Sequence, residues 1–103
     1  MTPFFDLNWP ASLNYGGIGV VIGHELSHGF DDEGVQWNGD GTLVDWMSPD
    51  AHYKFNLMAK CVQDEYSGFC PLKNTTYNPQ CVNGDNTQGE NIADNAGFYH
   101  ISV

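Results

Sequence analysis

The sequence predicts a small, mainly α-helical fold with one short β-hairpin. Apolar residues recur at helical spacing in two long segments, and helix-capping residues mark where the helices begin. A glycine-rich turn separates two short runs of strand-forming residues between those segments. The chain has 103 residues, of which 41% are hydrophobic, so it can form one domain with a modest core.

The first predicted helix starts at Asn14, a good N-terminal cap, and runs to His28, with Gly29 as its stop. It contains four glycines, at positions 16, 17, 19 and 23. Each glycine costs a helix roughly 1 kcal/mol relative to alanine, so tertiary packing must offset them. We therefore expect a buried helix that another segment of backbone approaches closely.

The predicted hairpin pairs residues 35–37 with residues 42–44 across the turn Asn38-Gly39-Asp40-Gly41. A second helix is predicted from Ser48-Pro49-Asp50, where a capping hydroxyl precedes proline and an acidic residue, to about Tyr66. Residues 67–86 are predicted to be a loop. Thr87 then opens a final helix.

The net charge of −10 argues against a nucleic-acid partner and against an anionic membrane surface, because both require basic residues. The most apolar segment, residues 18–23, is much shorter than the roughly twenty residues that cross a membrane. The N-terminus lacks the basic start and apolar core of a signal peptide.

The segment His24-Glu25-Leu26-Ser27-His28 carries the predicted chemistry. Two histidines four residues apart lie about 40° apart around a helix, so both imidazoles can reach one metal ion. Glu25 lies beside the metal, where a carboxylate can take a proton from a metal-bound water. The motif also fits two surface histidines, but the apolar helix before it favours burial, and buried imidazoles need partners.

Glu90 is the candidate third ligand that a catalytic zinc site requires. Asp94 follows at i+4, so one carboxylate can bind zinc while the other accepts the free N–H of a liganding imidazole. Thr87-Gln88-Gly89-Glu90 also fits a capping box, in which Glu90 would only cap its helix. The two helices taken together favour the ligand.

Asp31 and Asp32 follow His28 closely and leave two interpretations open. One of them can accept a hydrogen bond from the His28 imidazole. A surface acid or a turn former is an equal alternative.

Residues 14–19 and 21–32, which include Gly-His-Glu-Leu-Ser-His-Gly-Phe-Asp-Asp, closely resemble the neprilysin and endothelin-converting-enzyme family of zinc metallopeptidases. The segment Gly89-Glu90-Asn91-Ile92-Ala93-Asp94-Asn95 resembles the same family. Two long motifs at compatible spacing make the resemblance specific, and it extends over nearly the whole chain.

The resemblance implies that His24, His28 and Glu90 bind one zinc ion, that Glu25 is the catalytic carboxylate and that Asp94 orients His24. It implies a thermolysin-like zinc peptidase core. The implied enzyme is a metalloendopeptidase that cleaves oligopeptides, typically before a hydrophobic residue, by attack of a zinc-bound water that Glu25 activates. Family members face the extracellular space as type II membrane proteins, and some are secreted.

Family chains are several times longer, so the resemblance implies that residues 1–103 are part of a catalytic domain whose N- and C-terminal parts are missing. An upstream substrate-binding Asn-Ala segment and a downstream histidine and arginine are absent. We therefore expect little peptidase activity from the isolated chain. The alternative is an extracellular zinc-binding module without catalysis, although the intact Glu25 argues against it.

Three cysteines imply that one of them has a partner outside the chain. We predict a Cys70–Cys81 disulfide, with Cys61–Cys70 as the alternative. The resemblance implies that Cys61 pairs with a cysteine near the far C-terminus of family chains. Asn74 begins an N-glycosylation sequon, and the sequon together with the cysteines predicts an extracellular or luminal compartment.

Overall fold

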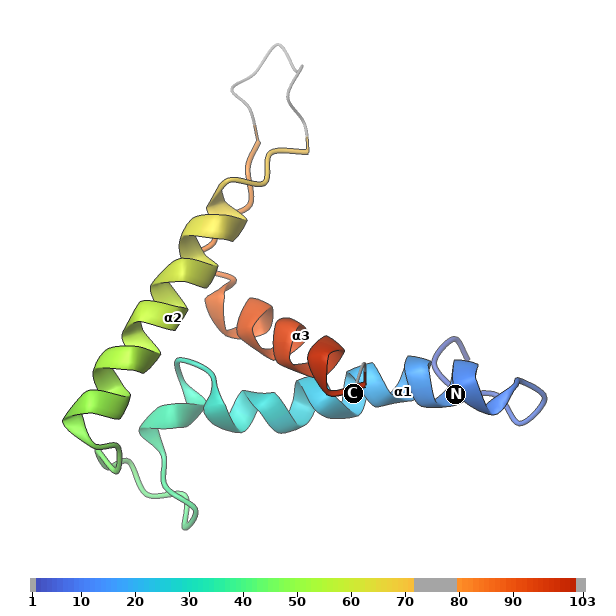
Figure 1. Cartoon of the computed structure of the whole chain (residues 1–103), viewed down its shortest axis with the longest axis horizontal. Coiled ribbons are helices and arrows are strands. Elements are labelled where there is room, and N and C mark those ends of the chain that lie inside the picture. The colour runs from blue at the N-terminus through green and yellow to red at the C-terminus, as the bar shows by residue number, and fades with distance from the viewer. Residues whose placement is uncertain (1, 72–79, 102–103) are drawn as a thin grey trace.

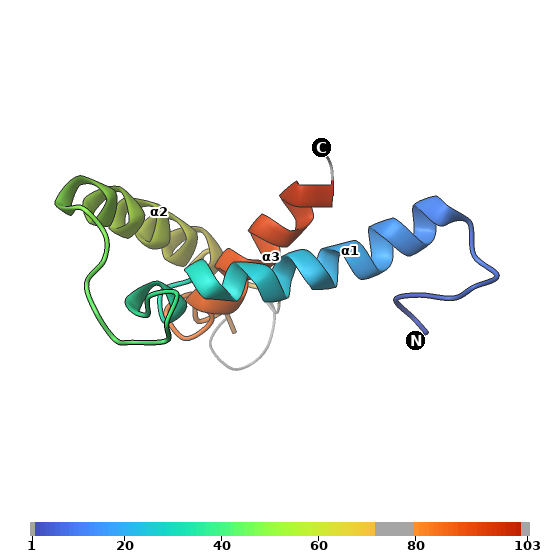
Figure 2. The ribbon, with the colours of Figure 1, turned by 90° about the horizontal axis from the view of Figure 1, so that it is seen from below.

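The computed structural model describes residues 2–71 and 80–101, which form three α-helices and two short 3₁₀ helices. Helix α3 contacts both of the other α-helices and crosses α1 (Figure 1, Figure 2). The elements are α1 (Ala11–Ser27), η1 (His28–Phe30), η2 (Gly34–Gln36), α2 (Pro49–Ser67) and α3 (Gln88–Ile101).

Helix α1 begins at Ala11, directly after Pro10, so the predicted start at Asn14 was wrong. The Asn14 side chain does not cap the helix because it binds the segment before it. Its Oδ1 accepts from the backbone N–H of Asp6 at 2.9 Å, and its Nδ2 donates to the Asp6 carbonyl at 2.8 Å. These two bonds fold the N-terminal segment back against α1.

The predicted β-hairpin is not present, and the described residues contain no strand. A single bridge joins Trp37 to Leu43, although the turn between them forms with Gly41 at a φ of 73°. The first predicted strand instead begins as the 3₁₀ helix η2. The Gln36 N–H, which would pair with the Val44 carbonyl in a hairpin ladder, donates instead to the carbonyl of Glu33 at 3.2 Å, so the ladder ends after one bridge.

Helix α2 confirms the second predicted helix. Ser48 Oγ accepts from the backbone N–H of Ala51 at 3.2 Å, and Pro49 occupies the first helical position. The helix ends at Ser67, one residue beyond the predicted end. Here the sequence carries complete local start signals, and tertiary contacts did not override them.

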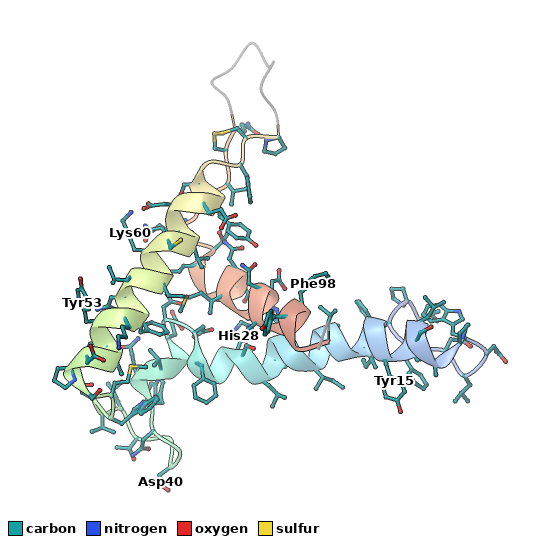
Figure 3. The ribbon with its side chains drawn as sticks, in the orientation of Figure 1. Tyr15, His28, Asp40, Tyr53, Lys60 and Phe98 are labelled. Carbon is teal, nitrogen blue, oxygen red and sulfur yellow. A yellow bond between two sulfur atoms is a disulfide. The ribbon has the colours of Figure 1, made fainter. Side chains whose placement is uncertain are left out.

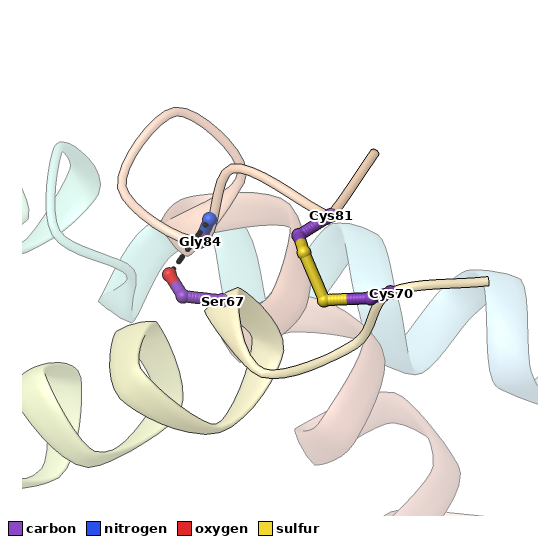
Figure 4. Close-up of a disulfide and its surroundings, with 4 residues drawn as sticks. All are labelled: Ser67, Cys70, Cys81 and Gly84. Carbon is purple, nitrogen blue, oxygen red and sulfur yellow. Dashed lines mark hydrogen bonds between the residues drawn. A yellow bond between two sulfur atoms is a disulfide. The ribbon is translucent and has the colours of Figure 1, made fainter. Parts of the chain in front are cut away.

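Two bonds close the chain between α2 and α3 (Figure 4). A disulfide joins Cys70 to Cys81, and Ser67 Oγ accepts from the backbone N–H of Gly84 at 3.2 Å. A β-carbon on Gly84 would lie 2.1 Å from the carbonyl oxygen of Gln63, so only glycine allows this contact. The chain therefore returns to the end of α2 before α3 begins.

The alternative Cys61–Cys70 disulfide is not formed, and Cys61 is exposed and free. Asn74 lies outside the described residues, so its predicted glycosylation stays a prediction. Among residues 2–71 and 80–101, no helix combines the length and the apolar character that crossing a membrane requires.

Helix α3 is anchored on α2 at its first residue and near its middle. The Gln88 side chain donates to the carbonyl of Ala59 on α2 at 2.8 Å, and the Asn95 amide donates to the Tyr66 hydroxyl at 3.2 Å. The small buried core lies around this helix, and Ala93 has no exposed surface. These contacts fix α3 against α2.

The expected close approach of backbone to α1 is confirmed at its crossing with α3. A β-carbon on Gly23 would lie 2.9 Å from the Cα of Gly97 on α3. The helix as a whole is not buried, however, since only Gly23 and Ser27 are buried within it and Leu26 is 71% exposed. Its many apolar residues therefore do not all face a core.

We predict that replacing both Cys70 and Cys81 with serine lowers the free energy of unfolding by about 3 kcal/mol, because the reduced chain gains loop entropy when unfolded. Urea denaturation followed by circular dichroism measures the change. Cys61→Ser is the matched control and should shift stability by less than about 0.5 kcal/mol. Equal stability of the double variant and the wild type would show that the disulfide does not hold the two helices together.

Candidate metal centre

Two imidazoles meet at the end of α1, near the start of α3. The ring centroids of His24 and His28 lie 4.5 Å apart, and the ring planes are nearly perpendicular at 87°. Figure 3 shows His28 where α1 and α3 come together. The His24 side chain is 17% exposed and that of His28 is 31% exposed, so both are accessible from one side.

A carboxylate holds the Nδ1 atom of each ring. Nδ1 of His24 lies 2.8 Å from an oxygen of Asp94 on α3, and Nδ1 of His28 lies 2.7 Å from an oxygen of Asp31. An ionised carboxylate can only accept, so each Nδ1 carries the proton. In each neutral ring the free lone pair therefore lies on Nε2, and this atom is available to bind a metal ion.

The Glu90 carboxylate reaches both Nε2 atoms. Its Oε2 lies 3.3 Å from Nε2 of His24 and 3.7 Å from Nε2 of His28. The capping-box alternative required Glu90 to accept from the backbone N–H of Thr87, but that N–H donates to the carbonyl of Asn83 at 3.1 Å. Glu90 therefore points to the imidazoles and not to its own helix end.

The three donors fit a zinc ion. His24, His28 and Glu90 each offer one ligand atom, and these atoms all lie within 4.8 Å of one another. Two ligand atoms that are each about 2 Å from a tetrahedral zinc ion lie about 3.3 Å apart. The two Glu90 distances match that spacing, and two nitrogens with one carboxylate oxygen form a donor set typical of catalytic zinc sites.

Asp31 satisfies both interpretations that the sequence left open. One carboxylate oxygen accepts from His28, and the other accepts from the backbone N–H groups of Glu33 at 3.0 Å and Gly34 at 2.7 Å. Asp31 is thus the turn former of the 3₁₀ segment and the partner of His28. No hydrogen bond or ion pair joins Asp32 to His28, and the buried Oδ1 of Asp32 has no hydrogen-bond partner within the described residues.

The pKa values of His28 and Asp31 are both shifted by their surroundings. The hydrogen bond to Asp31 raises the pKa of His28, and the charges of Glu90 and Glu25 add to this effect against partial burial. For Asp31, burial alone raises the pKa, but the hydrogen bonds from Gly34, His28 and Glu33 outweigh it and lower the pKa. Asp31 therefore stays ionised.

Glu25 lies on the exposed side of α1, where its charge acts on His28. It forms no hydrogen bond or ion pair with the part of the chain that the structure describes. Its carboxylate is therefore available to a molecule that approaches the exposed side of the two imidazoles.

One residue of this arrangement was missed by sequence reasoning. Gly97 packs against α1 next to His24. The signal available was its position, seven residues after Glu90 and hence on nearly the same face of α3. The spacing alone could not predict this contact, because the sequence does not show that α3 crosses α1 at Gly97.

Two histidines at i and i+4 on one helix, with a glutamate from a second helix, define the metal centre of zinc metallopeptidases with the His-Glu-x-x-His motif. The sequence pattern of peptidase family M13 matches residues 1–102. The chain therefore belongs to peptidase family M13, which confirms the resemblance to neprilysins.

Two neprilysins are similar in sequence to most of this chain. Neprilysin-1 of Caenorhabditis elegans is 50% identical over 96 residues, and human neprilysin is 48% identical over 96 residues, each match covering 93% of this chain. The inhibitor-bound crystal structure of Mycobacterium tuberculosis zinc metalloprotease ZMP1 superposes with a TM-score of 0.88 at 42% identity. That match covers 99% of this chain and 17% of the mycobacterial chain.

The chain spans only a small part of these proteins. The matched region is 12% of the length of both neprilysins. The similarity therefore concerns the segment that contains the candidate metal centre.

We predict that Asp31→Asn destabilises the metal-free chain by about 1 to 3 kcal/mol, because asparagine has one acceptor oxygen where three hydrogen bonds now use two. Thermal unfolding in the presence of EDTA measures the effect without metal. Asp40→Asn, at an exposed turn, is the control and should change stability by less than about 0.5 kcal/mol. A variant as stable as the wild type would mean that Asp31 does not organise this segment.

Proposed function

We propose that this chain is the zinc-binding part of the catalytic domain of a zinc metalloendopeptidase. One observation supports the proposal above all others: the two Nε2 atoms and the Glu90 oxygen converge while both Nδ1 atoms are held by carboxylates. A surface histidine pair has no need of two such partners. The surplus of negative charge around the pair also attracts a divalent cation.

In this proposal His24, His28 and Glu90 are the ligands of one zinc ion. Bound zinc would supply Lewis-acid polarisation of the scissile carbonyl. Asp94 keeps the proton on Nδ1 of His24, and Asp31 does the same for His28, so both rings present Nε2 without rotating. Asp94 and Glu90 both come from α3. This one helix therefore positions the ligand Glu90 and also Asp94, the hydrogen-bond partner of the ligand His24.

Glu25 is the proposed catalytic base. It is exposed, it lies on the same helix as both histidines, and its charge acts on His28. It would take the proton from the water that attacks the peptide carbonyl and deliver it to the leaving amine. No other carboxylate of the cluster is free for this task, because Asp31, Asp94 and Glu90 each contact an imidazole.

The proposed substrates are oligopeptides, with cleavage before hydrophobic residues, a preference that rests on the family resemblance. Because the chain spans 12% of the neprilysins it matches, we propose that activity belongs to a larger catalytic domain that includes residues 1–103. The Cys70–Cys81 disulfide supports an extracellular or cell-surface protein, either membrane-anchored or secreted, since oxidising compartments preserve such bonds. Cys61 then pairs outside this chain.

We predict that Glu90→Gln lowers the affinity for zinc at least about tenfold, because the amide oxygen is a neutral and weaker ligand than the carboxylate. Competition with a chromogenic chelator measures the dissociation constant. Glu65→Gln removes an exposed carboxylate from α2 and serves as the control for net charge. Wild-type affinity in Glu90→Gln would remove Glu90 from the ligand set.

We predict that Glu25→Gln, introduced into a longer protein that carries this segment, retains zinc but loses at least about 100-fold in kcat/KM, since glutamine cannot accept the proton. Hydrolysis of a quenched peptide with a hydrophobic residue after the scissile bond measures the rate, and metal analysis measures zinc content. Glu65→Gln is again the control. A zinc-loaded wild-type protein with no chelator-sensitive turnover would favour the non-catalytic zinc module instead.

A further inference from the structure

The crossing of α1 and α3 leaves no room for a side chain at Gly97. A β-carbon there would lie 2.7 Å from the backbone nitrogen of His24 and 2.8 Å from the carbonyl oxygen of Val20. Both are backbone atoms of a helix, so neither can swing aside as a flexible side chain does. Ordinary van der Waals contact begins at 3.4 Å, and alanine would force the two helices apart by roughly half an ångström or more.

This contact lies on the face of α3 that carries the site. Gly97 follows Glu90 by seven residues and Asp94 by three, which places the three residues within about 60° around the helix. On α1, the nitrogen that Gly97 approaches belongs to His24 itself. The point of closest approach therefore sits directly beside the side chains that meet across the two helices.

We infer that Gly97 is a positioning residue, which sets the distance from α1 at which α3 presents Glu90 and Asp94 to the imidazoles. The inference rests on the proposed zinc site. A binding site tolerates errors of only about half an ångström in its groups. The displacement that alanine imposes at Gly97 is of that size, and it acts on the ligand and on the partner of His24 together.

If Gly97 mattered only through the stability of α3, replacing it with alanine would have the opposite effect. Glycine inside a helix costs about 1 kcal/mol relative to alanine, so α3 alone would gain from alanine at this position. Gly16 on α1 provides the matched control, because a β-carbon there would meet nothing within 4 Å. Gly16→Ala should therefore preserve or raise helicity without moving α3.

The experiment is a double-mutant cycle on zinc affinity in the whole 103-residue chain, measured by chelator competition with far-ultraviolet circular dichroism on each variant. Gly97→Ala should weaken zinc binding by about 10-fold or more. In the Glu90→Gln background the same change should weaken binding by no more than about threefold, because the remaining ligands, His24 and His28, lie on α1 and directly after it and not on α3. Gly16→Ala should leave the affinity within about twofold of wild type.

The cycle separates positioning from general damage. A chain that merely unfolds through Gly97→Ala loses affinity equally in both backgrounds, and that result would overturn the inference. An unchanged affinity in Gly97→Ala, with a loss in Glu90→Gln, would also overturn it while leaving the proposed zinc site intact. If the wild-type chain itself does not bind zinc, the proposed function fails first.

Discussion

Helices α1 and α3 can cross with their backbones in contact because both carry glycine where they meet. A side chain at Gly23 or Gly97 would overlap the opposite backbone, so the approach depends on these two residues. The crossing brings His24 and His28 from one helix to Glu90 from the other. It also compensates in part for the poor helix propensity of the glycine-rich α1, because Gly23, one of the glycines that weaken the isolated helix, permits the contact that stabilises it.

The electrostatics of the site follow from this crossing. Asp94 and Glu90 come from α3, and Asp31 comes from the turn after α1, so carboxylates approach the two imidazoles from several sides. Without a cation these charges repel one another, and they hold the pKa of His28 above its ordinary value. Part of the free energy of folding is therefore spent on holding Asp31, Glu90 and Asp94 close together. A bound cation would reduce the repulsion between these carboxylates.

The sequence alone predicted features that depend on local signals. The start of α2 depends only on Ser48 and Pro49. His24 and His28 come together because they are four residues apart in a helical segment. Prediction from the sequence failed where contacts with other segments determine the local structure. The hairpin was lost because the Gln36 N–H bonds to the Glu33 carbonyl, and the start of α1 moved because Asn14 binds a neighbouring segment. The contact that sets the site depends on two helices far apart in sequence, so no local pattern revealed it.

The disulfide and the Ser67–Gly84 hydrogen bond close the chain at the point where it leaves α2 and returns toward α3. These two bonds do not involve His24, His28 or Glu90, so the chain closure is independent of the candidate metal site. Loop-closure entropy grows only slowly with length, so related chains can lengthen or shorten the segment between Cys70 and Cys81 through evolution at little cost. Because the disulfide joins both ends of this segment, an affinity tag or a fluorescent label inserted there should leave the contact between α1 and α3 unchanged.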